Sequence, residues 1–385
     1  MKNPFSKLIE KFGGEIDFFK KEPASVIGVD IGSSAIKVVQ LRREHGIAKL
    51  ETYGEIALGP YAGRAIGQVV TLKTDQLVQA LVDVMREANV TSKTGGISIP
   101  FTSSLVTMIR MPALPQKQLE KMIPLEARKY IPVPVNEVSL DWFILPERDE
   151  EMLPEHGENA QTVLQKKHAS APPQTNVLLV AIHNDVLNQY QSIVNQAKLD
   201  VDFYEIEIFS SIRAIVGQTI SSIGVLDIGA AKTKLYVVEY GIIKMSHLIN
   251  QGAQDLTLSL SRALGLSVER AEEEKRLAGL ETDDASAKEA LRLPLDRILS
   301  EVNRVFLSYE RKHNRNISRV ILTGGGAVLK GLLPLAKEKL ETDVVLGDPF
   351  AKTDAPAFLE DILKQVGPEF SVAVGLALRK LQARE

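Results

Sequence analysis

A pair of matching loops limits the folds open to this chain. The β-branched run Val26-Ile27-Gly28-Val29 leads into Asp30-Ile31-Gly32, and an apolar run from Ile36 to Leu41 follows, so we expect two strands joined by a tight loop. The same strand–loop–strand pattern returns between Gly224 and Val238, around Asp227-Ile228-Gly229. The repeat predicts two related α/β lobes, one around each loop.

A third loop follows the second copy of the pattern. The strand-like run Arg319 to Leu322 leads directly into Gly324-Gly325-Gly326, and a helix is expected to begin at Val328 and reach Leu340. Three successive glycines remove the side chains that would block a flat base or a ribose, and the helix N-terminus offers N–H donors nearby.

The chemistry of these loops suits a polyphosphate. Glycine lets backbone N–H groups approach a phosphate closely, an Asp can hold Mg²⁺ through water, and the hydroxyls and Lys37 supply further donors and positive charge. A single Asp-x-Gly is often an ordinary hairpin turn, but the three loops in this order favour ATP bound between two lobes. The candidate residues are Asp30, Gly32, Ser33, Ser34, Lys37, Asp227, Gly229, Ala230, Thr233, Gly324, Gly325 and Gly326, with Asp30 and Asp227 as the Mg²⁺ residues.

Two other nucleotide motifs are missing. No Gly-x-x-x-x-Gly-Lys-Ser/Thr occurs, so a Walker-type phosphate loop is excluded. The Gly324-Gly325-Gly326 loop does not satisfy the dinucleotide fingerprint, which argues against a nicotinamide enzyme.

Composition excludes several other classes of function. The 385 residues are 44% hydrophobic, enough for two or more domains with their own cores. The formal net charge of -3 offers no general attraction to nucleic acid, so no nucleic-acid partner is expected. With no cysteine, and six histidines without metal-ligand spacing, the sequence provides neither a disulfide framework nor a Cys-ligated zinc site.

The chain is expected on the cytoplasmic side of the membrane. No apolar run approaches the ~18 residues that a membrane span needs, and the N-terminus lacks the pattern of a signal peptide. Residues 1–21 place apolar side chains at helical spacing among lysines, so peripheral membrane contact is one interpretation, while packing on the protein body or on a partner is another.

With these loops the sequence resembles the actin-like ATPase superfamily. Its phosphate-one, phosphate-two and adenosine motifs match the three loops, Lys37 lies seven residues after Asp30 where actin-type members carry a phosphate-contacting lysine, and Thr233 lies six residues after Asp227. Within the superfamily the chain is most similar to the PilM proteins of type IV pilus assembly, which are related to FtsA, through Val26 to Leu41, Met111-Pro112 with the helix that follows, and Gln251 to Thr257.

The resemblance nominates three more residues. Ala271 to Arg276 is similar to the family's Ala-Glu-x-x-Lys helix, which implies that Glu272 and Lys275 reach the ribose and base; a solvated charged face is the alternative. Glu207 lies where the superfamily often places an acidic group near the attacking water. Ile208 follows it instead of the common Pro, so a surface carboxylate at a strand edge is the alternative, and the chain is expected to have at most slow ATPase activity.

The implied fold is α/β: an actin-like, duplicated ribonuclease H-like two-lobe fold with a small α+β domain inserted in the first lobe. The insertion favours PilM and FtsA over actin and sugar kinases, and the chain's end directly after a core helix favours PilM over FtsA. The expected segments are an amphipathic segment 1–22; a first lobe of 23–101, 199–220 and 367–385; an inserted domain 102–198 with a mobile loop 147–175; and a second lobe 221–366 with a helical subdomain at about 253–317.

The resemblance implies an ATP-binding component of the type IV pilus inner-membrane platform, in the cytoplasm at the inner face of the cytoplasmic membrane. Its implied partners are the cytoplasmic N-terminal tail of a PilN-like inner-membrane protein, bound as an extended peptide, and the pilus motor ATPases. The alternatives are a division or cytoskeletal ATPase similar to FtsA or MreB, and a small-molecule kinase of the same superfamily.

Overall fold

The computed structural model describes residues 25–145 and 174–382. The amphipathic segment expected at 1–22 and most of the loop expected at 147–175 lie outside the described residues. The end of that loop is a correction, because strand β7 already begins at Gln174. The described chain divides into two compact units, residues 1–102 with 188–385 and residues 103–187.

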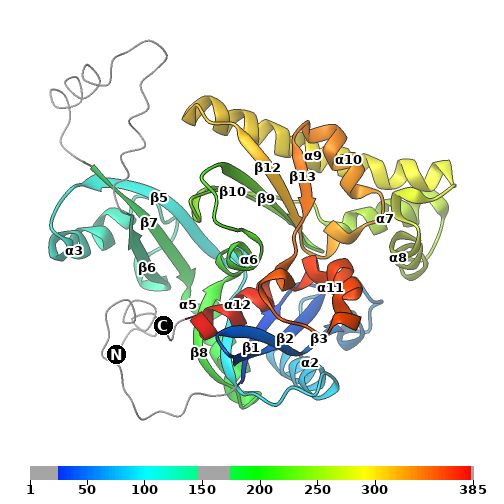
Figure 1. The fold of residues 1–385 in the computed structure, drawn as a ribbon, viewed down its shortest axis with the longest axis horizontal. Coiled ribbons are helices and arrows are strands. Elements are labelled where there is room, and N and C mark those ends of the chain that lie inside the picture. The colour runs from blue at the N-terminus through cyan, green and yellow to red at the C-terminus, as the bar shows by residue number, and fades with distance from the viewer. Residues whose placement is uncertain (1–24, 146–173, 383–385) are drawn as a thin grey trace. The chain divides into compact units, whose positions relative to one another are not determined.

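The first lobe of the larger unit is built on a five-stranded sheet. Its strands are β1 (Ser25–Ile31), β2 (Ala35–Glu44), β3 (Ile47–Ala57), β4 (Thr94–Ile99) and β8 (Asp200–Ile206), in the order β3-β2-β1-β4-β8. The first three strands pair antiparallel and the last two join in parallel. The strand–loop–strand prediction at Asp30 is thus confirmed, and helix α2 (Thr74–Glu87) follows β3 and precedes β4 in the chain (Figure 1).

The second lobe repeats this sheet. Strands β9 (Ser222–Ile228), β10 (Thr233–Glu239), β11 (Ile242–Ile249), β12 (Ile317–Thr323) and β13 (Asp343–Leu346) have the order β11-β10-β9-β12-β13, with the same sequence of antiparallel and parallel pairs. Two sheets with one topology confirm the duplication that the repeated Asp loops predict.

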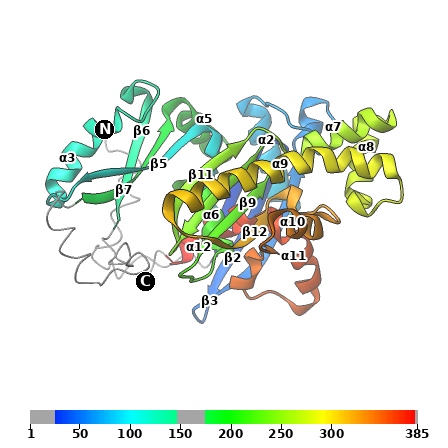
Figure 2. The ribbon, with the colours of Figure 1, turned by 90° about the horizontal axis from the view of Figure 1, so that it is seen from above.

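Helices enclose a separate core in the second lobe. Helices α7 (Ala253–Leu264), α8 (Val268–Leu277) and α9 (Ala285–His313) form the expected helical portion, and α9 packs against α7, as Figure 2 shows from above. Helix α10 (Leu332–Leu340) starts later than predicted, because Gly331 adopts a left-handed φ of 78° and separates it from the short 3₁₀ turn Gly325–Val328.

Two helices form the centre of the first lobe. Helix α6 (Glu207–Ile215) packs along α12 (Ser371–Gln382), and α12 also covers β1, β2 and β4. The approach is close, since a methyl group on Gly375 of α12 would overlap the carbonyl oxygen of Ser210 in α6. The short helix α11 (Glu360–Val366) contributes Leu363 to the same core.

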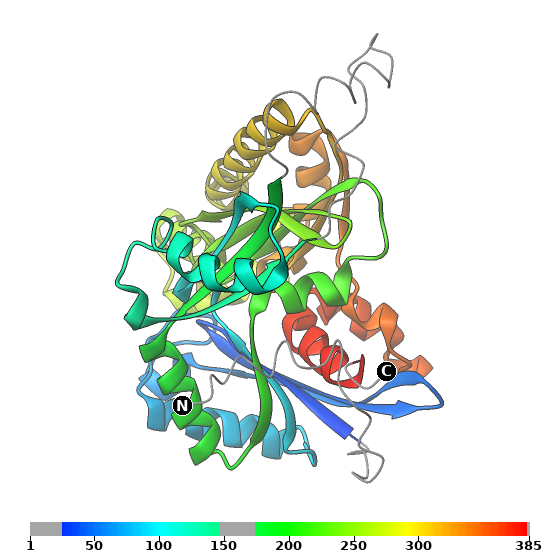
Figure 3. The same ribbon diagram turned by 90° about the vertical axis from the view of Figure 1, so that its left-hand side faces the viewer.

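The smaller unit carries its own sheet and core. Strands β5 (Ser104–Pro112), β6 (Val138–Ile144) and β7 (Gln174–His183) pair antiparallel in the order β5-β7-β6, and α3 (Gln116–Ala127) packs on them through Leu119, Ile123 and Ala127 (Figure 3). The unit ends at Leu187 rather than at 198, because most of α5 (Asn184–Gln196) groups with the larger unit. Among the described residues no helix combines the length and apolar character that a membrane span requires.

Candidate functional site

The two Asp loops are built alike. In each, the Asp is the penultimate residue of a strand and faces a lysine across the hairpin, since Asp30 pairs with Lys37 and Asp227 pairs with Lys234 in the strand registers. Each turn is closed by its glycine, because the N–H of Gly32 donates to the carbonyl of Ala35 (2.9 Å) and the N–H of Gly229 donates to Lys232 (3.1 Å).

Lys234 is a site residue that the sequence reasoning missed. Its Nζ donates to Oδ2 of Asp227 (2.9 Å) and to Oε2 of Glu207 (2.6 Å), and its side chain is 12% exposed. Burial opposes the charge, but the two carboxylates outweigh it and hold the pKa of Lys234 well above its usual range. The signal was in the sequence, because Lys234 follows Asp227 by the seven residues that separate Lys37 from Asp30.

The first Asp loop directs its lysine elsewhere. Ser98 at the end of β4 donates to Oδ1 of Asp30 (2.7 Å), while Nζ of Lys37 lies 3.3 Å from a carboxylate oxygen of Glu55 and 4.0 Å from one of Glu369. Burial raises the pKa of Asp30, although Ser98 and the nearby lysines lower it. The two loops therefore share a backbone design but differ in where their lysine is paired.

Glu207 lies inside the site rather than on a surface. It is the first residue of α6 and its side chain is 13% exposed, so the alternative of a surface carboxylate at a strand edge is wrong. Its Oε1 accepts the N–H of Phe101 (2.7 Å) and its Oε2 accepts Lys234. Burial raises the pKa of Glu207, with Lys234 opposing the rise. Both oxygens of this carboxylate are therefore already engaged.

The glycine loop lies directly on the second Asp loop. Gly324 has a left-handed φ of 82°, and a methyl group there would overlap Oδ1 of Asp227. A methyl group on Gly326 would overlap the side chain of Ile228, and one on Gly325 would lie 3.6 Å from Glu369. The approaches at Gly324 and Gly326 require glycine, whereas that at Gly325 is ordinary van der Waals contact. They bring the predicted adenosine loop against the predicted phosphate loop.

Glu272 and Lys275 are buried in α8 and pair with each other. Nζ of Lys275 donates to Oε2 of Glu272 (2.6 Å), to the hydroxyl of Thr257 (2.8 Å) and to the carbonyl of Ala253 (3.2 Å). They are 6% and 8% exposed, so the solvated-face alternative is wrong for these two, whereas the neighbouring Glu273 is exposed. The donors of Lys275 are committed to protein oxygens in this arrangement.

Backbone contacts join these parts across the two lobes. The N–H of Val69 in the first lobe donates to the side chain of Gln254 in α7 (2.8 Å), and the N–H of Val70 donates to the carbonyl of Ser33 (3.1 Å). A methyl group on Gly67 would lie 2.6 Å from the Glu272 carboxyl group. The first Asp loop and the α8 pair are thus connected through residues 67–70.

Thr233 and the two serines differ in their surroundings. The hydroxyl of Thr233 is buried and has no hydrogen-bond partner among the described residues. The carbonyls of Ser33 and Ser34 accept the N–H groups of Val70 and Leu58, which fixes the first loop. An unpartnered buried hydroxyl beside a glycine turn is one observation that fits an additional polar group at this loop.

The residues present fit a nucleotide with a divalent cation. Asp30 and Asp227 offer the oxygen donors that Mg²⁺ prefers, and glycine turns allow close approach of backbone N–H groups to phosphate oxygens. Within the described residues no three acidic or histidine side chains are close enough together to hold a metal directly. Lys234 already neutralises Asp227 and Glu207.

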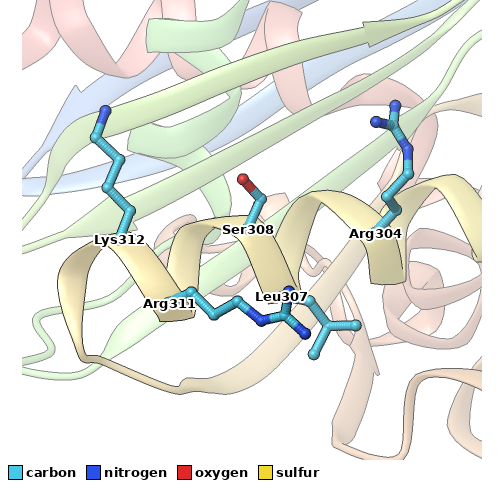
Figure 4. A pocket seen from close by; sticks show the side chains of 5 residues that line it. All are labelled: Arg304, Leu307, Ser308, Arg311 and Lys312. Atoms are coloured by element: carbon cyan, nitrogen blue, oxygen red, sulfur yellow. The ribbon is translucent and has the colours of Figure 1, made fainter.

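A separate surface hollow of about 490 Å³ lies on α9. Arg304, Leu307, Ser308, Arg311 and Lys312 line it, all from this one helix (Figure 4). None of the candidate nucleotide residues lies there, so this hollow is not the predicted site.

Known proteins share both the sequence pattern and the fold. The cell division protein FtsA of Pseudomonas aeruginosa is 25% identical over 93% of this chain and 89% of its own length. Among solved structures, the PilM-PilN type IV pilus biogenesis complex has a TM-score of 0.76 at 23% identity, covering 94% of this chain and 98% of its counterpart. The ethanolamine utilization protein EutJ of Carboxydothermus hydrogenoformans has a TM-score of 0.51 at 15% identity, covering 93% and 90%.

These similarities establish an actin-like ATPase fold. The family model described as type IV pilus assembly protein PilM matches residues 28–156 and 161–381, which is most of the sequence. This chain therefore belongs to the PilM family of type IV pilus assembly proteins.

Proposed function

We propose that this chain is an ATP-binding adaptor of the type IV pilus inner-membrane platform, whose nucleotide binds with Mg²⁺ between the two Asp loops. The observation that carries the proposal is the meeting of the glycine loop and the second Asp loop, where a side chain on Gly324 would overlap Asp227. Support comes also from the matching strand registers of the two Asp loops.

Each loop has a distinct role in this proposal. The backbone N–H groups of residues 33–34 and 230 donate to phosphate oxygens, while those of Gly32 and Gly229 close the two turns. The glycine loop at 324–326 receives the adenosine. Asp30 and Asp227 hold Mg²⁺ through water, and the ion neutralises part of the phosphate charge. Glu272 and Lys275 would exchange their mutual pairing for the ribose and base.

Glu207 is proposed as the residue nearest the hydrolytic step. A carboxylate whose oxygens are both engaged, by Phe101 N–H and by Lys234, is poorly placed to accept a proton from water. We therefore expect turnover to be slow, with binding rather than hydrolysis as the main use of ATP.

The smaller unit is proposed to bind the partner. The solved relative at TM-score 0.76 is a PilM-PilN complex. Strands β5 and β6 are the edges of the three-stranded sheet, and an extended peptide can add to such an edge through backbone hydrogen bonds. We propose a PilN-like tail as this peptide, a link to the pilus motor ATPases, and a place for the chain at the cytoplasmic face of the inner membrane.

Nucleotide binding and partner binding need separate tests. Asp30→Ala and Asp227→Ala should each abolish Mg-ATP binding measured by calorimetry, with an unchanged circular dichroism spectrum; unchanged ATP affinity in both variants would refute the site. Recovery of a PilN-like protein in a pull-down from native membranes tests the partner. We further propose that ATP and the PilN tail affect each other's binding. Equal affinity for the PilN tail with and without ATP would show instead that the two ligands bind independently.

A division ATPase is the second candidate, because FtsA is 25% identical over most of the chain. Nucleotide-dependent filaments in electron micrographs, together with no recovery of a PilN-like protein, would favour it over the pilus adaptor.

A further inference from the structure

Lys234 joins parts of the molecule that are distant in sequence. It lies on β10 of the second lobe, and its ammonium group bridges Asp227 at the end of β9 and Glu207 at the start of α6. The three side chains are between 7% and 13% exposed. A buried cation between two carboxylates is strongly held, because removing either charge leaves the other unpaired.

The charge balance of the site depends on this lysine. Asp30, Asp227 and Glu207 bring three carboxylates together, and each also feels the charge of Lys234. Lys37, the equivalent residue of the first loop, lies closest to Glu55 and Glu369, and its charge also acts on Asp30. Lys234 is therefore in direct contact with Asp227 and Glu207, two of these three carboxylates.

We propose that Lys234 is a built-in counter-cation of the nucleotide site, which takes over part of the charge neutralisation of a divalent metal and so reduces the Mg²⁺ dependence of nucleotide binding. The inference rests on the proposed ATP site. It adds that Lys234 supplies a positive charge within the second Asp loop. Lys37, at the same position of the first loop, lies closest to other carboxylates.

Two physical consequences follow from this arrangement. A phosphate entering the site meets an ammonium that already neutralises Asp227 and Glu207, so carboxylate–phosphate repulsion is reduced without metal. A divalent cation must share Asp227 with Lys234 or displace it, and Mg²⁺ gives up its own waters reluctantly. Metal should therefore bind weakly to the free protein.

The test compares Lys234→Gln with the control Lys244→Gln on β11, away from the end of that strand that pairs with Thr233. Binding of Mn²⁺ to the full chain without nucleotide is followed by electron paramagnetic resonance, and fluorescent MANT-ATP is titrated in Mg²⁺ and in EDTA. We expect Lys234→Gln to bind Mn²⁺ at least about tenfold more tightly than wild type. Without the ammonium group, the charges of Asp227 and Glu207 attract the metal ion with no nearby cation to repel it. The ratio of its nucleotide Kd in EDTA to that in Mg²⁺ should also rise at least about tenfold.

The outcomes separate this inference from the proposed function. Lys244→Gln and Lys234→Arg should behave as wild type in both titrations. Equal Mn²⁺ affinity in wild type and Lys234→Gln overturns the proposed counter-cation role of Lys234. The same conclusion follows without a variant if the wild-type Kd for MANT-ATP is more than about a hundredfold higher in EDTA than in Mg²⁺. Failure of wild type to bind MANT-ATP under any condition overturns the proposed function, while the Mn²⁺ comparison still decides the role of Lys234.

Discussion

Glu205 is the buried acid that holds the centre of the larger unit together. Its Oε1 accepts Nη2 of Arg213 (2.8 Å) and Nη1 of Arg379 (2.6 Å), and its Oε2 accepts Nη1 of Arg213 (2.6 Å) and the hydroxyl of Ser210 (2.5 Å). The carboxylate thereby links the end of β8 to α6 and α12. Replacing it by Gln keeps the shape and removes the charge.

The cost of Glu205→Gln follows from the groups that it leaves behind. Breaking a buried ion pair by removing one partner typically costs about 3–5 kcal/mol. Arg213 and Arg379 are 24% and 18% exposed, so water recovers part of the loss. In the variant, Arg213 also retains its hydrogen bond to the carbonyl of Gly375 (3.1 Å). Arg379 retains its cation–π contact with Phe203, 4.2 Å from the ring centroid. We therefore expect the lower end, a loss of about 3 kcal/mol in the free energy of unfolding.

Urea unfolding followed by far-ultraviolet circular dichroism measures this loss. The matched control is Glu44→Gln, because Glu44 also pairs with two cations, Arg42 (3.0 Å) and Lys49 (3.2 Å), but its side chain is 38% exposed. Exposed pairs contribute little, so the control should unfold at nearly the wild-type urea concentration.

The pH dependence gives a second readout of the same network. Burial opposes the charge of Glu205, but Arg213 and Arg379 outweigh it and hold its pKa below its usual range. Its contribution is therefore complete above the unfolded-state pKa and is lost as the pH falls through the lowered folded-state pKa. The difference between wild type and Glu205→Gln should be full at about pH 7 and shrink below about pH 4. Equal stability at neutral pH, or a difference that stays constant into acid, would refute this reasoning.

Three further predictions test other parts of the structure. A methyl group on Gly375 overlaps a carbonyl of α6, so Gly375→Ala should lower the free energy of urea unfolding by about 1–3 kcal/mol despite the better helix propensity of Ala. The control Gly217→Ala has open space around it and should change this free energy by less than about 0.5 kcal/mol. Equal effects of the two variants would contradict the close packing of α6 and α12. Gly324→Ala forces an L residue into a φ of 82° against Asp227, so the Kd for MANT-ATP should rise at least about tenfold, whereas an unchanged Kd would place the nucleotide elsewhere. Burial raises the pKa of Glu369 to about 7, so the folded state keeps a proton that the unfolded state has already lost. The free energy of unfolding of the wild type therefore falls as the pH rises from about 4 to about 8. Relative to wild type, Glu369→Gln should gain up to about 3 kcal/mol between about pH 4 and about pH 8, and a constant difference in urea titrations would exclude the buried acid.

The strands around the Asp loops could be predicted because their signals are local. A β-branched run, a glycine turn and a second apolar run specify a hairpin within about fifteen residues, and both hairpins form as expected. The late start of α10 was missed because a glycine near the start of a helical pattern, here Gly331, does not reveal its φ value from sequence.

The partners of the site residues could not be predicted in the same way. Glu207 and Lys234 are 27 residues apart and meet only because α6 and the second sheet pack within one unit. Spacing along one element identifies neighbours on that element but carries no information about charges brought in by another. The mutual pairing of Glu272 and Lys275 is a partial exception, since three residues apart on a helix are neighbours.

The sequence by itself determined the duplicated architecture, the positions of the three loops and the glycines that those loops need, because turn chemistry and strand alternation act over short range. Only the tertiary structure decided which charges meet: Lys234 between Asp227 and Glu207, Lys37 with Glu55 and Glu369, and Glu205 beneath two arginines. The physical reason is that burial decides the strength of an ion pair, and burial is a property of packed elements rather than of the order of residues.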